Sequence, residues 1–183
     1  MLRALVFKAI FATLPLVAFP AQAQDTGEVQ TLGPPMTLER LATILTAIDP
    51  DAVIAARGMT LTVASVPVTV IVDPVANRMR MLVPIASAAG LTEEELLRLL
   101  QANFDTALDA RYAVANGRLW STFIHPLAEL QSEQLIAGLA QTVTLAQTYG
   151  DTFTSGAIMF GGGDTRGLME ELMQELMDRG QEL

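Results

Sequence analysis

The sequence predicts an α+β domain in which helices pack on a five-stranded antiparallel sheet, with the elements in the order α-β-β-β-α-β-β-α. Two observations lead to this fold class. Apolar residues recur at helical spacing in some segments and alternate with polar residues in the shorter segments between them. The strands follow one another closely, without the β-α-β repetition that a parallel sheet needs. The chain has no cysteine, so a hydrophobic core must hold the domain without disulfides.

The domain is predicted over residues 37–160, and its first helix is TLERLATILTAI, residues 37–48. Thr37 is suited to cap this helix, and Asp49-Pro50 ends it, because the residue before a proline avoids the helical conformation. Apolar and polar residues alternate in the three strands that follow, which are residues 59–63, 68–72 and 78–85. The short turns between these strands predict an antiparallel meander.

The next helix begins at Thr92, because Thr92 and Glu95 have the spacing of a capping box. Glu93 and Glu94 also suit the positive end of the helix dipole. The helix has a wide apolar face made of Leu96, Leu97, Leu99, Leu100, Phe104 and Leu108.

A hairpin is indicated by Asn116-Gly117 between two apolar runs, since both residues of such a turn need a positive φ. Pro126 closes the fifth strand. Ser132 is expected to cap a third helix that runs to about Tyr149. The state of residues 150–160 stays open, because this apolar stretch contains two glycines.

The order of elements from Thr37 to Tyr149 resembles the type III secretion chaperone-like fold, and within it the YbjN-type domain. The segments that carry the resemblance are GMTLTVASVPVTVIVD, RMRMLVPIA, TEEELLRLLQANFDTALD, the NG hairpin with Leu119-Trp120, and the helix from Ser132. The resemblance implies a homodimer and a binding or regulatory role without catalysis. Secretion chaperones of this fold hold extended partner segments in apolar surface grooves. The family has no catalytic residues to transfer.

The N-terminus has the three-part pattern of a secretory signal over residues 1–23. Arg3 and Lys8 precede an apolar run, and the small residues of Ala21-Gln22-Ala23 predict cleavage between Ala23 and Gln24. The apolar run is shorter than the roughly 20 residues of a membrane span. We therefore expect a periplasmic protein with no membrane attachment after cleavage. Secretion chaperones work in the cytoplasm instead, so the resemblance predicts the fold rather than the task.

The chain is acidic, with a formal net charge of −9. Removal of the signal leaves nine Arg against twenty Asp and Glu, a charge of −11. Nucleic acid and anionic membranes both attract basic surfaces, so neither is an expected partner.

The C-terminal segment 167–183 predicts an amphipathic helix, separated from the domain by a glycine-rich linker at residues 161–166. Residues 24–36 are expected to form a flexible leader at the other end. The helix is short and marginal alone in water, so we expect it to lie on its own domain, a second subunit or another protein. Its apolar stripe, a tentative partner-binding surface, consists of Leu168, Met169, Leu172, Met173, Leu176 and Met177.

An alternative use of Met169, Met173 and Met177 is a periplasmic sensor of a small ligand or of copper, since thioethers suit Cu(I). The leucines beside them favour a docking stripe, because a metal site has no need of a parallel leucine row. We predict no cofactor and no metal.

Residues for common catalytic chemistry are sparse. His125 is the only histidine, and it stands beside a proline at a strand end, where a structural role is expected. Asp49 and Asp51 flank a proline in a turn that favours Asp for backbone hydrogen bonding. Trp120, the only tryptophan, is expected in the core or in a dimer interface. The sequence thus predicts an exported, non-enzymatic domain that binds an unknown protein partner and forms a homodimer.

Overall fold

A computed structural model of the chain describes residues 33–105, 107–149 and 165–180. These residues belong to one compact unit, Leu32–Leu183. The predicted signal and its cleavage site lie outside the described residues, as do residues 150–160 and most of the predicted leader and linker. No helix among the described residues is long and apolar enough to span a membrane.

The centre of the fold is an antiparallel sheet in the order β1-β2-β3-β4-β6-β5. The α+β fold class is confirmed, but the sheet has six strands and not five. The strands are β1 Val53–Ala55, β2 Gly58–Val63, β3 Val66–Asp73, β4 Arg78–Ser87, β5 Arg111–Ala115 and β6 Arg118–His125.

The strand that sequence reasoning missed is β1, at the edge of the sheet. All of its residues are exposed, so they show no alternation of apolar and polar side chains. Its three residues pair with β2 in the register Val53↔Thr60, Ile54↔Met59 and Ala55↔Gly58. The strand therefore exists through pairing with β2, which a sequence pattern does not reveal.

Among the described residues, four helices accompany the sheet: α1 Leu38–Ile48, α2 Glu93–Asp105, α3 Ser132–Gln147 and α4 Thr165–Gly180. Thr37 caps α1 as predicted, because its hydroxyl accepts the N–H of Arg40 at 3.2 Å. The capping box of Thr92 and Glu95 is also confirmed, with Glu95 Oε2 accepting the Thr92 N–H at 2.7 Å. The prediction that Ser132 caps α3 is wrong: Gln131 is the N-cap, and it forms a reciprocal capping box with Gln134.

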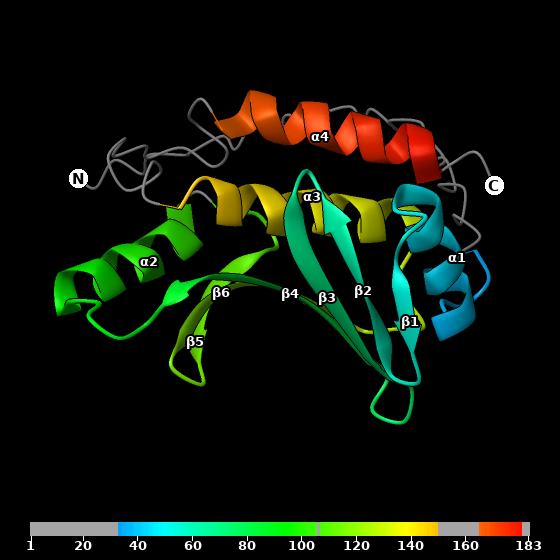
Figure 1. Cartoon of the computed structure of the whole chain (residues 1–183), viewed down its shortest axis with the longest axis horizontal. Helices are drawn as coiled ribbons and strands as arrows, with labels where there is room; N and C mark the ends of the chain where they lie inside the picture. The colour runs from blue at the N-terminus through cyan, green and yellow to red at the C-terminus, as the bar shows by residue number, and fades with distance from the viewer. Residues whose placement is uncertain (1–32, 106, 150–164, 181–183) are drawn as a thin grey trace, which may run out of the picture. The chain divides into compact units, whose positions relative to one another are not determined.

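One face of the sheet forms the main core. The inward residues of β2, β3 and β4 pack against α1 and α3, and α4 packs on these two helices. Helix α3 contacts β3, β4, β5 and β6, and Figure 1 shows α4 lying along α3 on the side away from the strands. Gly138 permits the close approach of α3 to β6, because a Cβ there would lie 2.8 Å from the Phe123 ring.

A smaller core joins α2 to the end of the sheet at β5 and β6. It contains Leu99 and Ala102 of α2, together with Tyr112 and Leu119. The side chain of Asn103 joins α2 to β5, since it accepts the Tyr112 N–H at 2.7 Å and donates to the Tyr112 carbonyl at 3.1 Å. Figure 1 shows α2 and α1 at opposite ends of the sheet.

Tight turns connect neighbouring strands where the sequence predicts them. Asn116 and Gly117 have φ values of 51° and 69°, which confirms the predicted hairpin. Ala64 and Ser65 also have positive φ, so the turn between β2 and β3 is made without glycine. The end of the predicted leader is ordered here, since Met36 is buried in the main core and donates its N–H to Ala128 O.

Candidate functional site

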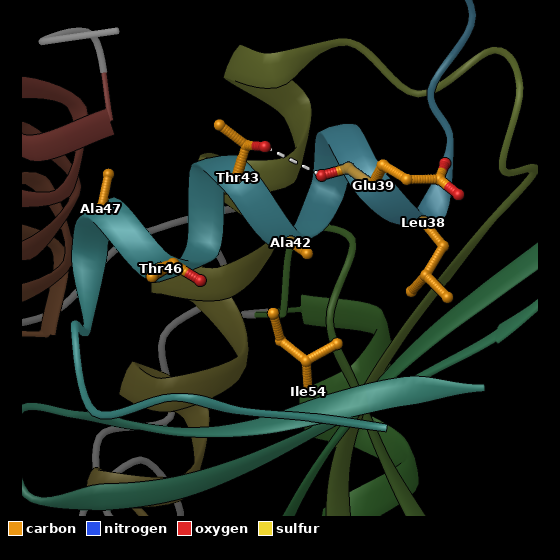
Figure 2. Close-up of a pocket in the computed structure, with 7 residues that line it drawn as sticks. All are labelled: Leu38, Glu39, Ala42, Thr43, Thr46, Ala47 and Ile54. Carbon is orange, nitrogen blue, oxygen red and sulfur yellow. Dashed lines mark hydrogen bonds between the residues drawn. The ribbon is translucent and has the colours of Figure 1, made fainter. Parts of the chain in front are cut away.

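An apolar groove lies between α1 and the edge strand β1. Its volume is about 770 Å³, within the range of roughly 300–1,000 Å³ typical of ligand pockets. Figure 2 shows Ala42 and Thr46 on the side of α1 that faces Ile54. The lining residues are Leu38, Glu39, Ala42, Thr43, Thr46, Ala47 and Ile54.

The helical spacing of α1 produces this wall. Leu38, Ala42 and Thr46 are four residues apart, so they share one helix face. Leu41 and Leu45 lie beside them and are fully buried in the core. One helix thus fills the core and also presents a second, narrower apolar row toward β1.

The other wall is the edge strand. Ile54 pairs with the inward-facing Met59, so its side chain is on the helix side of the sheet, yet 56% of its surface is exposed. Because β1 pairs only with β2, its outer backbone edge has no strand partner among the described residues. Such an edge can accept a further strand.

Two polar features mark the groove. The hydroxyl oxygen of Thr46 is buried and has no hydrogen-bond partner within the described part of the chain. A buried hydroxyl of this kind favours a bound group that completes its hydrogen bonding. At the rim, the pKa of Glu39 is lowered by a hydrogen bond with its own backbone and by one with the Thr37 hydroxyl, so this carboxylate stays charged.

The turn between α1 and β1 is fixed by Asp49. Its carboxylate accepts the Asp51 N–H at 3.0 Å and the Thr62 N–H at 2.7 Å. The expected role of these aspartates in backbone bonding is confirmed for Asp49. The bond from Thr62 connects this turn to β2, at a residue that β1 does not reach.

A second exposed apolar surface is the outer face of α2. Leu99 points into the small core, whereas 64% of Leu100 and 72% of Phe104 remain exposed. Leu96 and Leu97 are exposed as well. Only the inner part of the predicted wide apolar face is therefore used within the described chain. Apolar surface of this kind commonly marks an interface.

The predicted stripe on α4 packs against its own chain. Leu172 and Leu176 are buried in the main core, and Met173 and Met177 pack against it. Leu168 is 46% exposed, and Met169 is half-buried at the start of the stripe. Helix α4 is thus covered by α3 and α1, and binding of a separate protein by this stripe stays a prediction that would require α4 to leave.

The last turn of α4 also completes α1. Arg179 Nη1 donates to the Ile48 carbonyl at 3.3 Å, where α1 ends without a basic residue of its own. A cation at a helix C-terminus is stabilising. Neighbouring Gly180 packs against Ile136 and Ile44.

Met173 and Met177 pack against the core beside the leucines, as expected for a docking stripe. Within the described residues, no group of three or more His, Asp or Glu side chains could hold a metal ion. The copper alternative depends on the methionines alone and stays a prediction.

His125 and Trp120 both lie outside the main core. The His125 Nδ1 atom is 2.8 Å from the Pro126 carbonyl, and its ring stacks on Phe123, in keeping with the expected structural role. Trp120 is half-buried on the sheet face that α1 and α3 leave uncovered, opposite Pro84 of β4. Its indole donates to the Ala115 carbonyl at 3.0 Å, and the Arg118 guanidinium lies 5.9 Å from its ring centroid.

Comparisons with known proteins find solved structures that overlap with part of this chain at low sequence identity. No family model matches the chain, and neither does any curated protein. A chain in the crystal structure of the ExsC–ExsE complex is 18% identical over 54% of this chain and 77% of its own, with a TM-score of 0.41. A chain in the HopA1–SchA chaperone–effector complex is 12% identical over 64% of this chain and 99% of its own, with a TM-score of 0.47. The more specific YbjN-type assignment stays a prediction.

Proposed function

We propose that this chain is an exported, non-catalytic protein-binding domain that holds an extended segment of a partner along the groove between α1 and β1. One observation carries the proposal. Within the described part of the chain, an exposed strand edge without a strand partner runs beside an apolar groove whose lining includes a buried hydroxyl without a hydrogen-bond partner. A partner strand on β1 would gain backbone hydrogen bonds and would place alternate side chains toward α1.

The apolar lining sets the chemistry of the bound segment. Leu38, Ala42 and Ile54 favour aliphatic side chains at every second position of the segment. The side chain of Thr46 lines the same groove, with its hydroxyl oxygen buried. Because β1 has only three residues, backbone pairing alone is short, and side-chain burial must supply much of the affinity.

A homodimer is the second part of the proposal, and it rests on α2. Leu97, Leu100 and Phe104 follow helical spacing and are all exposed. An isologous dimer about a two-fold axis would pair this face with itself. Since α1 and α2 lie at opposite ends of the sheet, such a dimer leaves both grooves open.

Selection of random linear peptides displayed on phage tests the groove. The purified chain without its predicted signal is the bait, and Ile54→Asp is the groove variant. Val75→Asp is the matched control, because Val75 is also β-branched and is 97% exposed in the turn between β3 and β4.

We expect enriched peptides with apolar residues at alternate positions. Their affinity should fall about tenfold or more for Ile54→Asp, which corresponds to about 1.4 kcal/mol, and should not change for Val75→Asp. Bound peptide should also slow hydrogen exchange at the β1 amides. Peptides that bind Ile54→Asp as tightly as the unchanged chain would place the binding site elsewhere.

A further inference from the structure

The sheet face opposite the helices carries an unusual concentration of arginine for an acidic chain. Neighbouring strands align Ile71, Arg80 and Ile124 in one row across β3, β4 and β6, because Arg80 pairs with both isoleucines. The next row contains Leu82, Thr122 and Arg111. These side chains lie on the face away from Met81 and Phe123, which are buried in the core.

No helix of the described chain covers this face. The inward side of the same strands contacts α3, whereas Ile71, Arg80, Arg111 and Ile124 are exposed. The two isoleucines are separated by β4, so they lie about 10 Å apart at the usual spacing of strands. This width matches an α-helix, whose diameter with side chains is about 10–12 Å.

The charge of this face differs from that of the whole chain. Outward positions of β3 to β6 contain one carboxylate, Asp73, whose Oδ1 accepts the Ala76 N–H in the adjacent turn. The side chain of Arg80 has no hydrogen bond or ion pair to any other residue of 33–105, 107–149 or 165–180. The arginines on this face are Arg78, Arg80, Arg111 and Arg118.

We infer that this sheet face, centred on the row Ile71–Arg80–Ile124, binds an acidic amphipathic helix of a partner protein. Apolar side chains of the helix would cover Ile71, Leu82 and Ile124. Its carboxylates would pair with Arg80 and, on either side of it, with Arg78 and Arg111. Planar guanidinium groups suit carboxylates because they can donate two parallel hydrogen bonds.

This surface is separate from the groove, because Ile54 and α1 lie on the helix side of the sheet and the arginines lie on the other side. An acidic helix matches both the apolar and the cationic parts of the face. Nucleic acid matches only the cationic part, and both nucleic acid and anionic membranes would also meet the acidic remainder of the chain.

The test uses Trp120, the only tryptophan, which lies on the same face and serves as an intrinsic fluorescent reporter. The probe is a synthetic helical peptide with leucine along one stripe and glutamate beside it. The same peptide with lysine in place of glutamate is the control ligand. Arg80→Glu and the milder Arg80→Gln are the variants, and Arg98→Glu on α2 makes an identical charge change away from this face.

We expect the glutamate peptide to change the Trp120 emission in a saturable manner and to bind more weakly as salt is raised. Its Kd should rise about tenfold or more in Arg80→Glu, less in Arg80→Gln, and should not change in Arg98→Glu or in Ile54→Asp. The lysine peptide should not bind. A separate thermal melt of each variant verifies that it folds.

The inference is overturned if the glutamate peptide leaves the emission unchanged, or if Arg80→Glu and Arg98→Glu have the same Kd. Phosphatidylserine vesicles and single-stranded DNA are tested in parallel. Arg80-dependent binding of either one, without binding of the glutamate peptide, would assign the face to that polyanion instead. Failure of the groove proposal leaves these results unaffected, since Ile54→Asp tests the groove alone.

Discussion

At the residue scale, capping side chains fix the helix ends with few contacts. Glu95 accepts hydrogen bonds from both the N–H and the hydroxyl of Thr92 at the start of α2. These two bonds lower the pKa of the Glu95 carboxyl below its ordinary value of 4.5. The charged form is therefore the one that the folded helix favours.

This depressed pKa predicts a pH dependence of stability. A carboxyl with a lowered folded-state pKa stabilises the fold fully above its unfolded value, and the contribution disappears as pH falls through the folded value. We expect the urea concentration at the midpoint of unfolding to decrease as the pH is lowered below about 4.5. In Glu95→Gln this decrease with pH should be smaller. In Glu93→Gln, which lies outside the capping box, it should be the same as in the unchanged chain. Identical pH profiles for the two variants would contradict the assignment.

One substitution made at two helical glycines should have opposite effects. A Cβ at Gly138 would lie 2.8 Å from the Phe123 ring, whereas a Cβ at Gly167 meets nothing within 4 Å. Gly138→Ala should destabilise the fold by about 1–3 kcal/mol through overpacking. Gly167→Ala should stabilise α4 by up to about 1 kcal/mol, because alanine is the better helix former. Urea unfolding of both variants measures the difference.

At the element scale, the predictions held where burial imposed a pattern. The strands β2, β3 and β4 alternate cleanly, and the caps of α1 and α2 could be read from Thr37 and from Thr92 with Glu95. The strand β1 has three exposed residues and left no pattern to read. The cap of α3 was assigned to Ser132 because serine is a more usual cap than the glutamine that serves there.

Docking of α4 predicts a sharp contrast between two of its leucines. Leu176 is 1% exposed and Leu168 is 46% exposed. Leu176→Ala should cost about 2–5 kcal/mol of unfolding free energy, as expected for a fully buried leucine. Leu168→Ala should change it by less than about 0.5 kcal/mol. Equal small effects in urea unfolding would mean that α4 is not part of the core.

The exposed face of α2 predicts the oligomeric state. Sedimentation velocity should find a dimer for the unchanged chain. Replacing both Leu100 and Phe104 with Glu should raise the dimer Kd about 100-fold, or about 2.8 kcal/mol, because charge would then oppose charge across the two-fold axis. Val75→Glu is the control, since Val75 is exposed in the turn between β3 and β4 and does not belong to the apolar face of α2. A monomeric unchanged chain would refute the dimer.

At the scale of the whole molecule, the sequence predicted the class of fold but only part of the candidate sites. Ile54 and the row Leu38, Ala42 and Thr46 are separated by a turn, and nothing local indicates that they form one groove. The row Ile71–Arg80–Ile124 likewise depends on strand order and register. In contrast, helical periodicity predicts the apolar stripe of α4 and the apolar face of α2. It does not predict which other elements pack against these two surfaces.

Export is a prediction about the whole chain. In a bacterial host, the periplasmic fraction should contain a product whose N-terminal residue is Gln24. Ala23→Arg should leave an uncleaved precursor, because signal peptidase needs small residues at the cleavage site. Intact mass and N-terminal sequencing check both outcomes. A full-length product from the unchanged gene would contradict cleavage.

The insertion of Leu172 and Leu176 into the main core has a consequence for biosynthesis. These residues belong to the last helix, so they leave the ribosome after every strand and the other three helices. Until then the surface that α1 and α3 present to α4 stays uncovered, and α1 lacks the Arg179 contact at its end. The nascent chain therefore lacks this part of its core until α4 has left the ribosome. For a protein proposed to be exported, this order of assembly gives the export machinery time to act before the native state forms.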